Sequence, residues 1–330
     1  MQISTRNISK LTAFVLVLTS AFSSVAFPLG TYALTLAMFG LPHVLTELRY
    51  IDTRFSKRLD STLRQRILLL LFAIFGIRCL QVIGVMSTQL SIPLELSCVA
   101  CLVVLVIPIF TSKNWQLKIL SLGGILGVVI LMFLTAGIFF APTLTLLFFA
   151  IFHNITPVGF IAEKLRGLQR RSALWLCFLI FAVIPLIIIS GLPYQLLSSF
   201  GLTALQASIL NVGNMDSHLG VFVPAQLHTE AIAIHAFSAA VFLQCMHYVV
   251  VIGIFSRWTN YTELQKVDSF FWWLSIEHFY KFVLFLSVLL FVSFIASFRD
   301  ARAIYGIAAA IHAWVEIPIL LLTLAIPARE

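Results

Sequence analysis

Four histidines of this chain lie within apolar runs, where ionisable side chains are unusual. They are His43, His153, His247 and His312. Burying an ionisable side chain in a membrane helix is costly, so such residues are functional candidates by default. Neutral imidazole is also the commonest protein ligand for iron, copper and zinc. We therefore predict an intramembrane metal site that has these four histidines as its ligands.

Counting residues from the expected helix ends gives each histidine an approximate depth in the membrane. His153, His247 and His278 lie at roughly one level, about 12–14 Å from the basic ends of their spans, at about 1.5 Å per residue. His43 is shallower and His312 is deeper on the same scale. A lone intramembrane histidine is ordinarily explained by a hydrogen bond between helices. Several histidines at similar depth favour a shared site.

Two carboxylates and one amide accompany these histidines. Glu47 follows His43 by four residues and Glu316 follows His312 by four, so each pair shares one helix face. A carboxylate beside a ligating imidazole can fix its tautomer, or it can bind the metal directly. The alternative explanation is a local hydrogen bond, and solvation at the membrane edge for Glu47. Asn154 could orient the neighbouring histidine or hydrogen-bond a helix end.

The composition defines the environment in which this site must form. The chain has 330 residues, of which 61% are hydrophobic and 10% are charged, whereas soluble domains carry about 25% charged residues. Its mean hydropathy is +1.05, and it contains repeated apolar runs of about 20 residues. We predict an all-α fold, a polytopic integral membrane bundle of about ten transmembrane helices in a single domain, 1–330. A water-soluble enzyme and a nucleic-acid partner are excluded.

The predicted spans are separated by turns and by short charged loops. They cover residues 11–27, 32–47, 67–85, 92–111, a fifth run ending near 140, then 143–162, 173–190, 231–255, 270–298 and 303–326. Lys and Arg concentrate in alternate loops, which accounts for the net charge of +8. By the positive-inside rule, both termini are cytoplasmic, and we expect a bacterial inner membrane. Only Arg299 and Arg302 contradict this pattern.

The connection 191–229 contains no Lys or Arg, which places it on the non-cytoplasmic side. Within it, Ala204–Val212 could form a short amphipathic or re-entrant helix. The connection is long enough to act as a lid over a site. A plain surface loop is an equally good explanation.

Other features of the spans predict structure more than chemistry. Ser24-Val25-Ala26 resembles a signal-peptidase site, but we expect an uncleaved first helix because a second span follows at once. Pro157 should bend its helix shortly after the second histidine. Arg78 should snorkel or pair with a carboxylate. Glu277 and Lys281 have the spacing and order of a structural ion pair.

Short motifs around the four histidines resemble a known family. Gly40-Leu41-Pro42-His43 looks like the GLPH opening of the Brp/Blh family of membrane β-carotene 15,15′-dioxygenases. Three further segments resemble that family's later elements: Leu147 to His153, Ala240 to His247, and the Gly- and Ala-rich run Tyr305 to His312. Val44-Leu45-Thr46-Glu47 replaces the family's own continuation. Val251 stands where the family has a further ligand, so we assign His312 as the fourth ligand here.

The resemblance implies a function as well as an architecture. It implies a non-haem Fe(II) site, O₂ as co-substrate, and oxidative cleavage of a carotenoid, giving retinal in the case of β-carotene. The 30 phenylalanines fit an apolar substrate entering sideways from the lipid bilayer, although aromatic residues at membrane interfaces are the ordinary explanation.

Two other classes of function stay open at the level of sequence. One is a transporter or channel that uses buried His and Glu side chains to bind protons or substrate. The other is a haem-binding electron carrier, for which His153 and His247 could be axial ligands. No haem attachment motif is present in the sequence.

Overall fold

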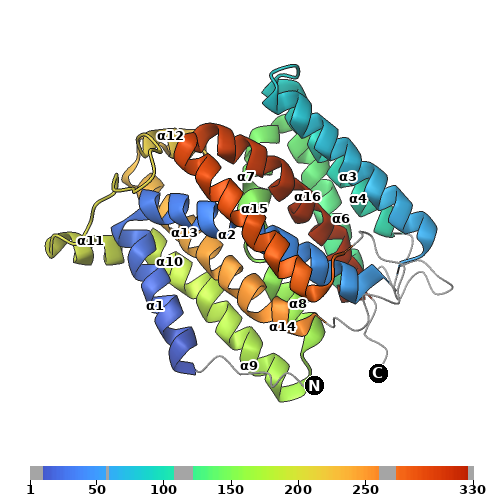
Figure 1. Cartoon of the computed structure of the whole chain (residues 1–330), viewed down its shortest axis with the longest axis horizontal. Helices are drawn as coiled ribbons and strands as arrows, with labels where there is room; N and C mark the ends of the chain where they lie inside the picture. The colour runs from blue at the N-terminus through green and yellow to red at the C-terminus, as the bar shows by residue number, and fades with distance from the viewer. Residues whose placement is uncertain (1–9, 57–58, 108–121, 260–272, 326–330) are drawn as a thin grey trace.

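The computed structural model of the chain is a helical bundle (Figure 1). It describes residues 10–56, 59–107, 122–259 and 273–325, and these ranges contain no strand. Within them, eight helices are long and apolar enough to cross a membrane, and a bent pair of helices raises the number to nine. The prediction of an all-α polytopic membrane bundle is therefore confirmed.

The long helices are as follows. They are α1 (Lys10–Ala26), α2 (Pro28–Phe55), α3 (Ser61–Val82), α4 (Thr88–Val106), α6 (Leu122–Phe140), α7 (Pro142–His153), α8 (Thr156–Lys164), α9 (Gly167–Phe178), α10 (Ile184–Ile189), α13 (Ala231–Val250), α15 (Ile276–Ala296) and α16 (Phe298–Ala325). Single π-helical turns join α9 to α10 (Leu179–Val183) and α13 to α14 (Val251–Phe255, then Ser256–Trp258). The first predicted span corresponds to a shorter apolar helix, Leu11–Ala26. The predicted ends at residues 111, 270 and 326 lie outside the described residues.

Three helices form the centre of the bundle. About 72% of the apolar window of Ala231–Trp258 is buried, and the corresponding values are 61% for Phe298–Leu324 and 56% for Pro28–Phe55. The more peripheral spans Ser61–Val82 and Ile276–Ala296 are each buried over only 17%. Each central helix carries one of the four histidines, so the site lies where the lipid is excluded most completely.

Helix α2 is longer than the sequence predicts. The expected span ended at Glu47, whereas the helix continues to Phe55 through residues assigned to a basic loop. Those charged side chains find partners inside the protein. Arg49 lies 4.0 Å from the ring centroid of Phe279, and Arg54 pairs with Glu163 at 3.1 Å. Because their charges are compensated, the helix does not have to end there.

Helices α7 and α8 form one bent span. The angle between them is 41°, and the break falls directly after His153. Pro157 occupies the first turn of α8, where its missing N–H is tolerated. The predicted bend is confirmed, and it places His153 at a helix end inside the bundle.

The connection 191–229 differs from its predicted form. It contains α11 (Leu192–Ser199), α12 (Asp216–Leu219) and a 3₁₀ turn, Ala225–Leu227, but residues 204–212 are not helical. The backbone N–H of Ala204 donates to Ala26 O at 2.8 Å, and the Ala207 carbonyl packs against Gly30. The prediction of a helix over 204–212 is wrong because this segment bonds across to the α1–α2 junction instead.

A close helix contact supports the position of α7, and it can be tested. A Cβ added to Gly137 on α6 would lie 2.7 Å from Thr145 Cγ2 and 2.8 Å from Thr145 Cβ on α7. We expect Gly137→Ala to lower the free energy of unfolding by about 1–3 kcal/mol through overpacking, seen as a lower thermal midpoint in detergent.

The control for this prediction lies on the same helix. At Gly127 the nearest atom to an added Cβ is 3.7 Å away. Gly127→Ala should be neutral or stabilising, since alanine has the higher helix propensity. Equal thermal midpoints for the two variants would show that the α6–α7 contact is not tight.

Candidate metal centre

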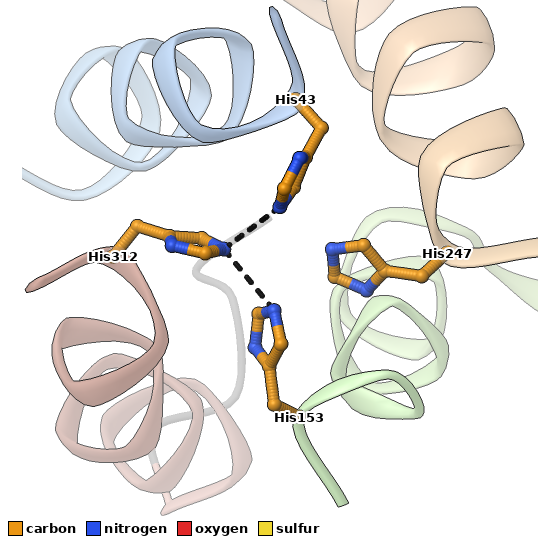
Figure 2. Close-up of side chains that lie close together, drawn as sticks. All are labelled: His43, His153, His247 and His312. Carbon is orange, nitrogen blue, oxygen red and sulfur yellow. Dashed lines mark hydrogen bonds between the residues drawn. The ribbon is translucent and has the colours of Figure 1, made fainter. Parts of the chain in front are cut away.

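The four predicted histidines converge in the structure. They come from four different helices: His43 from α2, His153 from the end of α7, His247 from α13 and His312 from α16. Figure 2 shows their rings pointing toward one common point, and one nitrogen of each lies within 4.8 Å of the others. Residues separated by up to 269 positions thus form one cluster.

The spacing of the ring nitrogens suits ligands of a single ion. His312 Nε2 lies 3.1 Å from His43 Nε2 and 3.1 Å from His153 Nε2. Metal–imidazole bonds are about 2.0–2.1 Å long, so two ligands on one ion are about 3.0 Å apart at 90° and about 3.4 Å apart at the tetrahedral angle. The observed distances lie between these two values.

Hydrogen bonds to the outer nitrogens leave the inner nitrogens free to act as ligands. His43 Nδ1 donates to Phe39 O at 3.1 Å, and His153 Nδ1 donates to Glu316 Oε2 at 3.0 Å. The hydroxyl of Thr156 also donates to Glu316 Oε2, at 2.5 Å. A proton on Nδ1 leaves a lone pair on Nε2, which is the usual outer support of a metal-bound histidine. Glu316 therefore lies behind the cluster, as predicted.

Glu47 has a different position. It is 0% exposed, and its Oε2 lies 3.2 Å from His247 Nε2, the ring nitrogen that faces the centre. The angles are not those of a hydrogen bond, and within the described structure neither Glu47 oxygen has a hydrogen-bond partner. Glu47, His312 and Glu316 also form a second group of donor atoms within 4.8 Å. Glu47 thus lies beside the ligands, where it can bind the same ion directly.

The charge of the cluster favours a bound cation. Glu47 and Glu316 are both fully buried, and among the described residues neither pairs with a lysine or arginine. An isolated buried carboxylate is unfavourable by several kcal/mol. A divalent cation held by the imidazoles would neutralise both carboxylates. The donor set therefore fits a metal on grounds of distance and of charge.

Two further predictions about side chains near the cluster can be compared with the structure. Asn154 was expected to support a ligand, but its Nδ2 donates to Ala150 O at 3.0 Å and so closes the end of α7. His278 shares the depth of His153, yet it is exposed and bonds Ser275. It is not part of the site. The Glu277–Lys281 ion pair is present, at 2.8 Å.

Other side chains near the centre were not singled out from the sequence. The Tyr248 ring packs on His43 with centroids 4.2 Å apart, and Tyr305 lies on the other side at 6.5 Å. Position offered a clue, since Tyr248 directly follows a predicted ligand. Arg78 pairs with buried Glu95 at 2.7 Å, as one of its two predicted roles requires. Trp314 Nε1 also donates to Glu95, at 2.6 Å.

A cavity of about 960 Å³ reaches the cluster. Three of the four histidines line it, namely His43, His153 and His312, together with Tyr248 and Tyr305. This volume is at the upper end of the range for sites that bind small organic molecules. A molecule in the cavity would lie directly against the candidate metal ligands.

No family model, no curated protein and no solved structure matches this chain. The similarity to Brp/Blh proteins is confined to the short segments given above. The chemistry of the site follows from its own donor atoms, which are four imidazoles and two carboxylates.

Proposed function

We propose that this protein is a membrane-embedded, non-haem iron oxygenase that acts on a long apolar isoprenoid such as a carotenoid. The convergence of four buried imidazoles on one point, at the wall of a large cavity, carries the proposal. The Brp/Blh-like segments supply the choice of iron and of substrate class.

The donor set supports iron as the metal. Nitrogen and carboxylate oxygen donors without thiolate suit Fe, as well as Zn, Cu and Ni. Bound iron would supply O₂ activation at the coordination positions that the protein leaves open. In the overall reaction a C=C bond breaks and one oxygen atom of O₂ goes to each carbon. Two carbonyl products form, and no external reductant is needed.

The protein's own residues hold, orient and enclose. His43, His153, His247 and His312 would hold the metal, with Glu47 beside them and Glu316 fixing the His153 ring. The cavity wall would place one double bond of the substrate against this group. Burial of the centre among α2, α13 and α16 excludes water from it, which protects reactive species from side reactions.

The setting supports a substrate that is dissolved in the membrane. The bundle is a membrane protein by the length and hydropathy of its helices. We further infer a bacterial inner membrane with both termini in the cytoplasm, from the distribution of Lys and Arg among the loops. A lipid-soluble substrate can then enter from the bilayer without a soluble domain.

The arrangement of the rings argues against a haem carrier. The His153 and His247 rings have centroids only 4.5 Å apart, and His312 lies 4.6 Å from His153. Axial ligands of haem lie on opposite faces of a wide porphyrin, and these rings leave no gap for one. The transporter alternative is tested by the metal content.

The proposal predicts a metal content and a spectrum. Elemental analysis of the detergent-purified protein, prepared without chelators, should give about one iron per chain, because one ligand cluster is present. The absorption spectrum should lack a Soret band. Expression in a β-carotene-producing host should bleach the cells, with retinal among the products.

Several outcomes would count against the proposal. Metal-free protein after chelator-free purification would favour a transporter. A Soret band would favour haem. Stoichiometric zinc with no iron would keep the site but remove the oxygenase chemistry. Bound iron with unchanged β-carotene would keep the oxygenase and point to another isoprenoid substrate.

A further inference from the structure

The end of the cavity away from the histidines is basic. Its lining there includes Arg299 and Arg302 at the start of α16, and Ser217 and Gly220 of the 191–229 connection. The cavity thus joins a cluster of metal-binding side chains to two guanidinium groups. These are the two arginines that contradict the positive-inside pattern, so loop orientation does not explain them.

Arg302 is held in place by its neighbours. Its side chain is half-buried, and Nη1 lies 3.2 Å from His218 Nδ1. His218 Nε2 in turn donates to Val212 O at 2.7 Å, so Nδ1 is left to accept from Arg302. Burial lowers the pKa of His218 below its ordinary value, which keeps this ring neutral at neutral pH. Arg302 is therefore fixed by neutral groups and keeps its full charge.

No carboxylate compensates either arginine. Within the described ranges, neither Arg299 nor Arg302 forms an ion pair, whereas Arg54 and Arg78 are paired with Glu163 and Glu95. The adjacent Asp300 accepts from the Ser297 hydroxyl at 2.7 Å. Two uncompensated guanidinium groups at a cavity mouth are the arrangement expected for binding a carboxylate or a phosphate.

We propose that Arg299 and Arg302 bind the anionic head group of an amphiphilic substrate, whose apolar chain runs along the cavity to the four histidines. The head group is a terminal carboxylate or phosphate. The inference deepens the proposed function, on which it rests for the chemistry. It narrows the substrate from a plain hydrocarbon to a long-chain isoprenoid or lipid acid.

The dimensions of the cavity agree with this binding mode. Arg302 and His312 lie on one helix ten residues apart, so about 15 Å separates them along α16. Between them the wall is apolar or small, including Gly306 and Ala309 on α16 and Phe222 from the connection. An anchored head group would set which carbon of the chain reaches the metal. This arrangement provides regioselectivity without polar contacts to the reacting carbons.

The test compares ligands that share a chain and differ in the head group. Binding to the purified full chain in an uncharged detergent is measured for palmitate, palmityl phosphate and palmityl alcohol, by competition against radiolabelled palmitate. We expect the two anions to bind at least about tenfold more tightly than the alcohol, which is the order of a hydrogen bond to a charged group. Preference for either anion identifies the head group and supports the proposal.

Variants locate the head group at the arginines. Arg299→Gln changes an exposed side chain, so it should fold normally while weakening palmitate binding several-fold. Arg302→Gln should weaken it by about tenfold or more, and Arg302→Lys should restore part of the loss. The control is Arg170→Gln with Arg171→Gln, which removes two exposed charges elsewhere on the protein. This control should leave palmitate affinity unchanged.

A second pair of variants locates the chain. No atom lies within 4 Å of a Cβ added to Gly306, which lines the cavity, or to Gly76, which does not. Gly306→Phe should therefore block palmitate binding, while Gly76→Phe should leave it unchanged. Normal palmitate affinity in Gly306→Phe would overturn the inference, because the chain would then lie outside the cavity.

The two proposals fail in different ways. Equal binding of palmitate and palmityl alcohol by iron-loaded protein would overturn the head-group site and leave the iron centre standing. Tight, arginine-dependent palmitate binding by protein that never contains metal would remove the oxygenase and leave the head-group site standing.

Discussion

Replacing His312 by alanine should reduce metal affinity more than about 100-fold, because loss of an outer-shell partner alone reduces it by about 10–100-fold. His312 Nε2 is the nitrogen closest to two others, at 3.1 Å from both His43 and His153. Its removal therefore opens the centre of the ligand set rather than one edge. The measurement is metal per chain after dialysis against a graded series of buffered metal concentrations.

The matched control for His312→Ala is His278→Ala. His278 is an exposed histidine of a membrane helix and takes no part in the cluster. Its replacement should leave metal content unchanged. The two proteins should also elute alike from a sizing column, which separates loss of the site from loss of the fold. Full metal retention in His312→Ala would remove this residue from the ligand set.

The sequence was sufficient to select the ligands because their selection depends on a local property. A histidine inside an apolar run is conspicuous without knowledge of its neighbours, as His43, His153, His247 and His312 all show. The same holds for the bend at Pro157, which follows from the backbone chemistry of one residue. The helical fold likewise follows from apolar runs of membrane-spanning length.

The arrangement around those ligands depended on contacts between helices, which sequence spacing does not provide. Depth is one coordinate of a side chain and its direction around the helix axis is another, so His278 shared a level with His153 without facing it. The end of α2 was misplaced because the partners of Arg49 and Arg54 belong to other helices.

The carboxylates illustrate the same limit. Their i,i+4 spacing correctly placed Glu47 and Glu316 on the faces of His43 and His312. Their closest imidazole nitrogens, however, belong to other helices: Glu47 approaches His247, and Glu316 bonds His153. Each carboxylate therefore links two helices through the site, which is a tertiary feature rather than a local one.

Glu47→Gln should change stability in opposite directions with and without metal. In metal-free protein the buried Glu47 carboxylate has no compensating charge, so the neutral amide should raise the free energy of unfolding, by about 3 kcal/mol if the residue is fully ionised. With metal bound, the same substitution removes an anionic neighbour of the cation and should weaken metal binding. Thermal midpoints in detergent, measured with and without added Fe(II), would record both effects.

Glu316→Gln provides the comparison that separates the roles of the two carboxylates. Glu316 holds His153 through Nδ1 and also accepts from Thr156. The amide can keep one of these contacts through its oxygen, so metal affinity should fall by about 10–100-fold, as for other outer partners of ligands. If Glu47 binds the metal, Glu47→Gln should also shift the ligand-field spectrum of a cobalt-substituted protein, whereas Glu316→Gln should not. Identical spectra for wild type and both variants would return Glu47 to a supporting position behind the four imidazoles.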